Sequence, residues 1–212
     1  MGFTAGIIGL PNVGKSTIFN ALAGGNAAMG AYPFTTVEPN RGVVVVPDPR
    51  LQRIAGILGK TQPIPTHIEF FDVAGLVRGA SHGEGLGNTF LGHIRGVDAL
   101  VHVVRCFQSV EAQHVLGSVD PVRDVEIIRT ELLLADQQLL QRDLSRVEKR
   151  AQGGDRDAAA RVHTLAAMIE HLNRGEVLSR FPTSDVSRAI VAEYGLITAK
   201  PVLYVANVAE GG

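Results

Sequence analysis

Apolar residues follow a strand-like pattern in several short segments of this chain. Nearly continuous apolar runs, rich in valine and isoleucine, are typical of buried strands. They cover residues 4–10, 42–46, 67–71, 99–104 and 201–206. Segments with helical spacing separate most of these runs. Because doubly buried strands suit a mostly parallel sheet with helices on both faces, we predict an α/β fold.

One long segment, residues 122–178, has no strand pattern. Its apolar residues recur at steps of three and four, which predicts helices. The first stripe is Val125, Ile128, Leu132, Ala135, Leu139, Leu140, Leu144 and Val147, and the second is Val162, Leu165, Ile169 and Leu172. Residues 152–155, QGGD, predict a turn between them. We expect an antiparallel helical hairpin between the fourth and fifth strands, with two ordinary sheet-covering helices as the alternative.

These patterns predict a division of the chain into three parts. A sheet-containing unit takes residues 1–121 and 199–212, the helical hairpin takes 122–180, and a return segment takes 181–198. The hairpin would then be an insertion into the sheet-containing unit.

The first strand leads into a motif that predicts phosphate binding. Residues 9–16 read GLPNVGKS, which fits G-x-x-x-x-G-K-[ST], and a helical pattern follows over 17–22. Glycines in such a loop let consecutive backbone N–H groups converge on an anion. Lys15 would supply positive charge to the β- and γ-phosphates, and the Ser16 hydroxyl would ligate Mg²⁺. The alternative, a glycine-rich turn without a ligand, does not explain the strand–loop–helix order.

Two further segments carry candidate phosphate and metal contacts. The third strand ends in D-x-x-G, where Asp72 would hold Mg²⁺ through water and the N–H of Gly75 would approach the γ-phosphate. Between the two phosphate motifs, Thr36 is the expected switch threonine that ligates Mg²⁺, with Thr35 in reserve. A solvated aspartate and an ordinary turn threonine are the alternatives.

Leu76 stands where many GTPases have a water-orienting glutamine. Leucine has no hydrogen-bonding group, so hydrolysis requires another residue to position the attacking water. His82 and Glu84, in a glycine-dense loop over 79–87, and His114 are candidates. Each is more simply interpreted as a surface residue.

The last strand runs into Asn207-Val208-Ala209-Glu210, which departs from the N-K-x-D motif of GTP-specific proteins. Val208 replaces the lysine that packs over guanine. Glu210 replaces the aspartate that accepts both guanine N–H donors, and its carboxylate lies one methylene further out. Losing a bidentate contact weakens base discrimination, so the motif leaves room for ATP.

Composition limits the partners of the chain. It has 212 residues, 45% of them hydrophobic, with a net charge of −1, which gives no bulk attraction to DNA or an anionic membrane. Its single cysteine, Cys106, excludes an internal disulfide framework and fits a reducing compartment. Without a leader-like or membrane-length apolar run, we expect a cytoplasmic monomer. A local basic stripe at Arg142, Arg146, Lys149 and Arg150 is a candidate RNA contact, or else a solvated helix face.

Taken together, these motifs resemble those of the YchF family, the Obg-like ATPases of the translation-factor class. The matching segments are GLPNVGKST, YPFTTVEPN, PDPRL, DVAGLVRGASHGEGLGN, HVVRCF, HVLGSVDP and NVAE. The resemblance implies a Ras-like domain with a coiled-coil insertion. It also implies Mg²⁺-dependent ATP hydrolysis with some tolerance of GTP, a hydrophobic residue at Leu76, and association with ribosomes.

The resemblance also implies roles for single residues. Phosphates would contact Asn12, Val13, Gly14, Lys15, Ser16 and Thr17, and the base would lie near Phe107, Asn207, Val208 and Glu210. His114 would align the attacking water, with Lys15 as the other catalytic residue. Asn12 resembles the asparagine that helps to bind a monovalent cation in potassium-stimulated GTPases. His82 departs from the lysine expected there, and the family pattern continues past Gly212 into a further strand and a TGS domain. A nucleotide-stabilised binding module without significant turnover is the alternative function.

Overall fold

The computed structural model describes residues 2–24, 40–60, 62–73, 86–109 and 113–210. A five-stranded sheet lies at its centre, in the order β2-β3-β1-β4-β5. The strands are β1 (Phe3–Ile8), β2 (Asn40–Val45), β3 (His67–Asp72), β4 (Ala99–Arg105) and β5 (Val202–Asn207). Each predicted strand is present, with its ends shifted by at most two residues.

The sheet is mostly parallel, as predicted. Strand β1 pairs in parallel with β3 and β4, and β4 pairs in parallel with β5. Only β2 runs antiparallel, along β3. The carboxyl ends of the four parallel strands therefore meet at one edge of the sheet, which is where open α/β sheets bind ligands.

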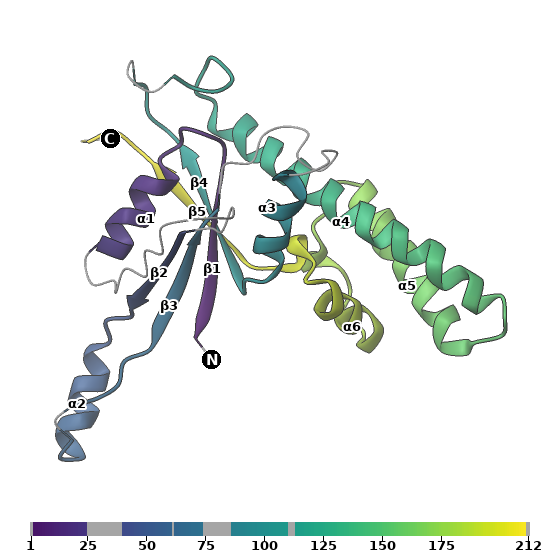
Figure 1. Cartoon of the computed structure of the whole chain (residues 1–212), viewed down its shortest axis with the longest axis horizontal. Coiled ribbons are helices and arrows are strands. Elements are labelled where there is room, and N and C mark those ends of the chain that lie inside the picture. Colours follow the sequence, from purple (N-terminus) through teal and green to yellow (C-terminus); the bar gives the residue numbers. More distant parts are fainter. Residues whose placement is uncertain (1, 25–39, 61, 74–85, 110–112, 211–212) are drawn as a thin grey trace.

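Helices cover both faces of this sheet. Helix α1 (Lys15–Gly24) lies on one face and α3 (Leu86–Arg95) on the other (Figure 1). On the α1 face, Phe19 packs against the backbone of β2, and on the α3 face Ile94 packs against β1. Helix α2 (Pro49–Ile57) connects β2 to β3 and is capped by the preceding Asp48, whose carboxylate accepts the N–H of Arg50. The apolar pattern did not predict α2, because only Ala55 of this helix is buried.

The predicted helical hairpin is present. Helix α4 (Pro121–Ala151) and helix α5 (Arg156–Asn173) run side by side and extend away from the sheet (Figure 1). The first half of α4 packs into the sheet core through Ile128 and Leu132. Its second half joins a separate core, formed with Leu165 and Met168 of α5. None of the helices in the described ranges is both long and apolar enough to cross a membrane.

The return segment completes this second core. The 3-10 helix η1 (Leu178–Arg180) ends the predicted hairpin segment, and the return segment contains the helix α6 (Asp185–Tyr194) and runs into the 3-10 helix η2 (Ile197–Ala199). Ile190 of α6 and Leu196 are buried with the α4–α5 residues. The hairpin is therefore a three-helix unit rather than a pair of helices alone.

A buried carboxylate joins this unit to the sheet. Asp136 of α4 is fully buried and lies 2.8 Å from Nη1 of Arg95, at the end of α3. It also accepts the backbone N–H and the hydroxyl of Thr198, each at 2.8 Å, and the N–H of Ile197 at 3.2 Å. One side chain thus holds α3, α4 and the chain entering β5 together.

Candidate nucleotide site

The GLPNVGKS loop connects the end of β1 to the first residue of α1. Three of its residues have a positive φ, Gly9 with 149°, Asn12 with 61° and Gly14 with 95°. A Cβ atom at Gly14 would lie 2.4 Å from Nδ2 of Asn207. The backbone conformation therefore favours glycine at this position, and a side chain there would also displace the amide of Asn207.

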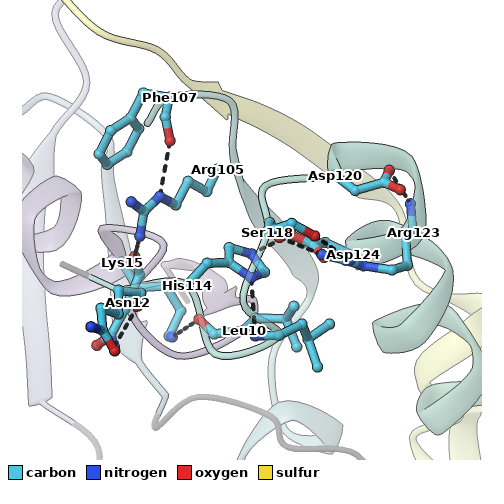
Figure 2. Close-up of polar contacts among 12 residues, drawn as sticks. Leu10, Asn12, Lys15, Arg105, Phe107, His114, Ser118, Asp120, Arg123 and Asp124 are labelled. Atoms are coloured by element: carbon cyan, nitrogen blue, oxygen red, sulfur yellow. Dashed lines mark hydrogen bonds and ion pairs between the residues drawn. The ribbon is translucent and has the colours of Figure 1, made fainter. Parts of the chain in front are cut away.

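Lys15 is folded into this loop. Its side chain is buried, and its ammonium donates to the carbonyl oxygen of Leu10 at 2.8 Å (Figure 2). Burial lowers the pKa of Lys15, and the negative charge of Asp72 partly offsets that effect. A cation held this close to the loop backbone is placed to meet a phosphate group without a large rearrangement.

The structure brings two predicted metal ligands together. The hydroxyl of Ser16, in the first turn of α1, donates to Oδ2 of Asp72 at 2.8 Å. Asp72 is the last residue of β3, so the two side chains come from segments 56 positions apart in the chain. Adjacent oxygen ligands of this kind suit Mg²⁺, which is bound by one or two protein oxygens together with phosphates and waters.

The expected base motif reaches the same loop. Asn207, the last residue of β5, donates from its side-chain amide to the carbonyl oxygen of Val13 at 2.9 Å. Val208 and Glu210 follow it and are exposed. This part of the predicted base site therefore lies open beside the phosphate loop.

His114 is buried, so its interpretation as a surface residue was wrong. Its Nε2 lies 2.7 Å from Oδ2 of Asp124, in the first turn of α4. Its Nδ1 accepts the backbone N–H of Leu116 at 3.1 Å. Because Nδ1 accepts, Nε2 is the ring nitrogen that faces the carboxylate as a donor. Both nitrogens are engaged in this arrangement, and the role of His114 in aligning water stays a prediction.

Sequence reasoning missed Arg105, the last residue of β4. Its side chain is only 1% exposed. Nε donates to the carbonyl oxygen of Phe107 at 3.0 Å, and Nη1 donates to that of Asn12 at 3.3 Å (Figure 2). A charged residue at the end of a mostly apolar strand was the available signal, since a buried guanidinium needs several acceptors.

Arg105 and His114 share a cavity of about 360 Å³ beside the phosphate loop. Polar groups form most of its wall. The lining residue Gln113 is joined to the phosphate loop, because its carbonyl oxygen accepts the side-chain amide of Asn12 at 3.3 Å. The lining residues are Arg105, Gln108, Ser109, Gln113, His114, Gly117, Ser118 and Val119.

Several predicted site residues lie outside the described residues. They are Thr35, Thr36, Gly75, Leu76, His82 and Glu84. Their proposed contacts with Mg²⁺, the γ-phosphate and the attacking water stay predictions.

The basic stripe on α4 is partly neutralised. Arg146 pairs with Asp143 at 2.6 Å, and Arg150 pairs with Asp155 at 3.0 Å. Both arginines remain well exposed. The pairing reduces the net positive charge that this face offers to an RNA phosphate backbone.

His102 provides a prediction for the pH dependence of stability. Burial in β4, and secondarily the charge of Lys15, lower its pKa from 6.5 to about 4. As pH falls below 6.5, the unfolded chain therefore binds a proton before the folded chain does. This histidine should make folding about 3 kcal/mol less favourable at pH 4 than at pH 7.

Urea unfolding at several pH values, with His102→Gln as the test variant, measures this contribution. Other groups also titrate in this range, so the relevant quantity is the difference in pH dependence between variant and wild type. The variant should have the flatter profile between pH 6.5 and 4. His163→Gln, at an exposed position on α5, is the matched control and should retain the wild-type profile. If the free energy of unfolding depended on pH in the same way for His102→Gln and wild type, the lowered pKa of His102 would be contradicted.

Comparisons with known proteins agree with this geometry. A family model described as 50S ribosome-binding GTPase matches residues 4–141. The ribosome-binding ATPase YchF of Escherichia coli O157:H7 is 48% identical over 212 residues, which are 100% of this chain and 58% of that protein. Its Bacillus subtilis counterpart is 46% identical over 210 residues, covering 99% of this chain and 57% of that protein.

A solved structure of a YchF GTPase from Schizosaccharomyces pombe also aligns with the chain. It has a TM-score of 0.77 and 36% sequence identity, over 99% of this chain and 57% of that one. The chain thus spans less than two thirds of the length of these relatives. With its phosphate loop between β1 and α1, its mostly parallel sheet and this match, the chain belongs to the family of 50S ribosome-binding GTPases and, within it, to the YchF group.

Proposed function

We propose that this chain is the nucleotide-binding part of an ATP-hydrolysing switch that tolerates some GTP, depends on Mg²⁺ and associates with ribosomes. The observation that carries this proposal is the convergence of Lys15, Ser16 and Asp72 at one end of the phosphate loop. A lysine beside a hydroxyl–carboxylate pair is the arrangement that a Mg²⁺–triphosphate group requires.

Magnesium would be held by Ser16 and, through water, by Asp72, with Thr36 as the expected third contact. When bound, the ion would neutralise charge on the β- and γ-phosphates. Lys15 would leave the carbonyl oxygen of Leu10, or share it, in order to contact the same phosphates. Gly75 is the expected donor to the γ-phosphate, which would couple the third strand to the state of the nucleotide.

The preference for ATP rests on the residues that follow β5. Asn207 is committed to the phosphate loop, and the next residues are Val208 and Glu210 instead of lysine and aspartate. A guanine-specific site needs a carboxylate in register with both guanine N–H donors, and the longer glutamate side chain does not reproduce that register. Phe107 is the proposed neighbour of the base.

Ribosome association is proposed from the relatives, which are named ribosome-binding ATPases. The α4–α5 hairpin is the part of this chain that extends farthest from the sheet and is our choice for the contacting surface (Figure 1). His114 hydrogen-bonds to Asp124 near the start of α4, and the carbonyl oxygen of the neighbouring Gln113 accepts the side-chain amide of Asn12, so the base of the hairpin is linked to the phosphate loop.

Competition binding and a single-turnover assay test this function together. With Mg²⁺ present, ATP should displace a fluorescent ADP analogue at lower concentration than GTP does. Bound ATP should then be converted to ADP and phosphate in one slow turnover, because Leu76 orients no water. Intact ATP retained for hours would support a nucleotide-stabilised binding module instead. If neither nucleotide displaced the probe at millimolar concentration, both readings would be wrong.

A further inference from the structure

Side chains at the ends of two neighbouring strands donate hydrogen bonds to the backbone of the phosphate loop. Arg105 ends β4 and Asn207 ends β5, and the two residues are paired in register across the sheet. Arg105 donates to the carbonyl oxygen of Asn12, and Asn207 donates to that of Val13. Two consecutive carbonyl groups of the loop are therefore fixed by hydrogen bonds from the sheet.

Fixing these carbonyl groups also fixes the N–H groups that follow them. A trans peptide is planar, and its C=O and N–H bonds point in opposite directions. When Arg105 holds the carbonyl of Asn12 on the sheet side, the N–H of Val13 must point to the other side. The left-handed backbone of Asn12 has an alternative in the ordinary right-handed region, and rotation to it would redirect that N–H.

From this geometry we infer that Arg105 is a positioning residue of the phosphate site, which orients the N–H of Val13 toward the bound nucleotide. This inference rests on the proposed function. The buried guanidinium donates through Nε and Nη1 to carbonyl oxygens of the chain itself, so we assign Arg105 no direct contact with the nucleotide. Its effect on affinity passes through the loop backbone.

Burial and stacking make the guanidinium a rigid support. Its Nε donates to the carbonyl oxygen of Phe107, and its central carbon lies 4.5 Å from the centre of the Phe107 ring. Lysine cannot reproduce this arrangement, because a single ammonium lacks the planar fork that reaches two acceptors in fixed directions. The same side chain thus connects the phosphate loop to the proposed neighbour of the base.

The test compares Arg105→Gln and Arg105→Lys with wild type by calorimetry of ADP binding. Arg105→Gln should lose about tenfold or more in affinity for ADP, because the N–H of Val13 is no longer aligned with the phosphate that it would bind. Arg105→Lys should lose less, at least about threefold, because it retains a charge but not the fork. Arg129→Gln is the matched control, since it removes another arginine–carbonyl contact, to Gly175, far from the loop. It should bind ADP as wild type does.

Amide NMR separates positioning from a general loss of structure. In both Arg105 variants the Val13 amide signal should shift before any ADP is added, while the buried β1 amides, such as that of Ile7, keep their positions. If Arg105→Gln does not fold, the ADP affinity and the Val13 amide signal of Arg105→Lys test the inference alone. Wild-type ADP affinity in the variants, or an unmoved Val13 signal, would overturn the inference. If wild type took up no ADP, the proposed function would fail, and the Val13 signal would still decide whether Arg105 orients the loop.

Discussion

Replacing Lys15 by methionine should abolish most nucleotide turnover while leaving the fold intact. Methionine keeps most of the apolar stem of a side chain that is already buried, so the packing of that stem at the start of α1 is retained. It removes the ammonium that would stabilise charge on the γ-phosphate as the bond to it breaks. Loss of one such preorganised group should lower single-turnover ATP hydrolysis by about 100- to 1,000-fold.

Quench-flow measurement of phosphate release checks this expectation, with unfolding by urea as the test of the fold. Lys60→Met is the matched control, because Lys60 is an exposed lysine after α2 and far from the loop. It should hydrolyse ATP at the wild-type rate. Turnover by Lys15→Met within about threefold of wild type would remove the central support for the proposed function.

Local patterns predicted most of the fold and the core of the site. The GLPNVGKS loop was recognisable because its glycines, lysine and serine are contiguous and flanked by a strand and a helix. Asp72 was predictable because the carboxyl ends of parallel strands meet at one edge of a sheet. The helical hairpin followed from stripes repeated over many turns of helix, which is the most reliable periodic signal.

Contacts between distant segments were not predictable in this way. Arg105 reaches Asn12 across 93 positions of sequence. Asp124 is only ten positions from His114, but their contact depends on how the chain turns into α4. Neither contact produces a repeating pattern of apolar and polar residues in the sequence. In the same way, the extension of the hairpin core by Ile190 of α6 depends on how the return segment packs.

Asp136 illustrates the energetic consequence of such a distant contact, and Asp136→Asn should destabilise the protein strongly. The wild-type carboxylate is fully buried, and both of its oxygens accept hydrogen bonds, from Arg95, Ile197 and Thr198. Asparagine has the same shape, but it places an NH₂ group against donors and leaves the Arg95 guanidinium without its counter-charge. Breaking a buried ion pair from one side should lower the free energy of unfolding by about 3 kcal/mol or more.

Urea denaturation followed by circular dichroism measures this loss, and Glu126→Gln provides the control on the same helix. Glu126 also pairs with an arginine, Arg129, but its side chain is 56% exposed. A solvent-screened pair of this kind contributes little, so the control should remain within about 0.5 kcal/mol of wild type. Equal stability of the two variants would mean that the buried network among α3, α4 and η2 does not hold the hairpin to the sheet. Selective loss in Asp136→Asn would identify that network as the joint through which the hairpin and the nucleotide-binding sheet depend on each other.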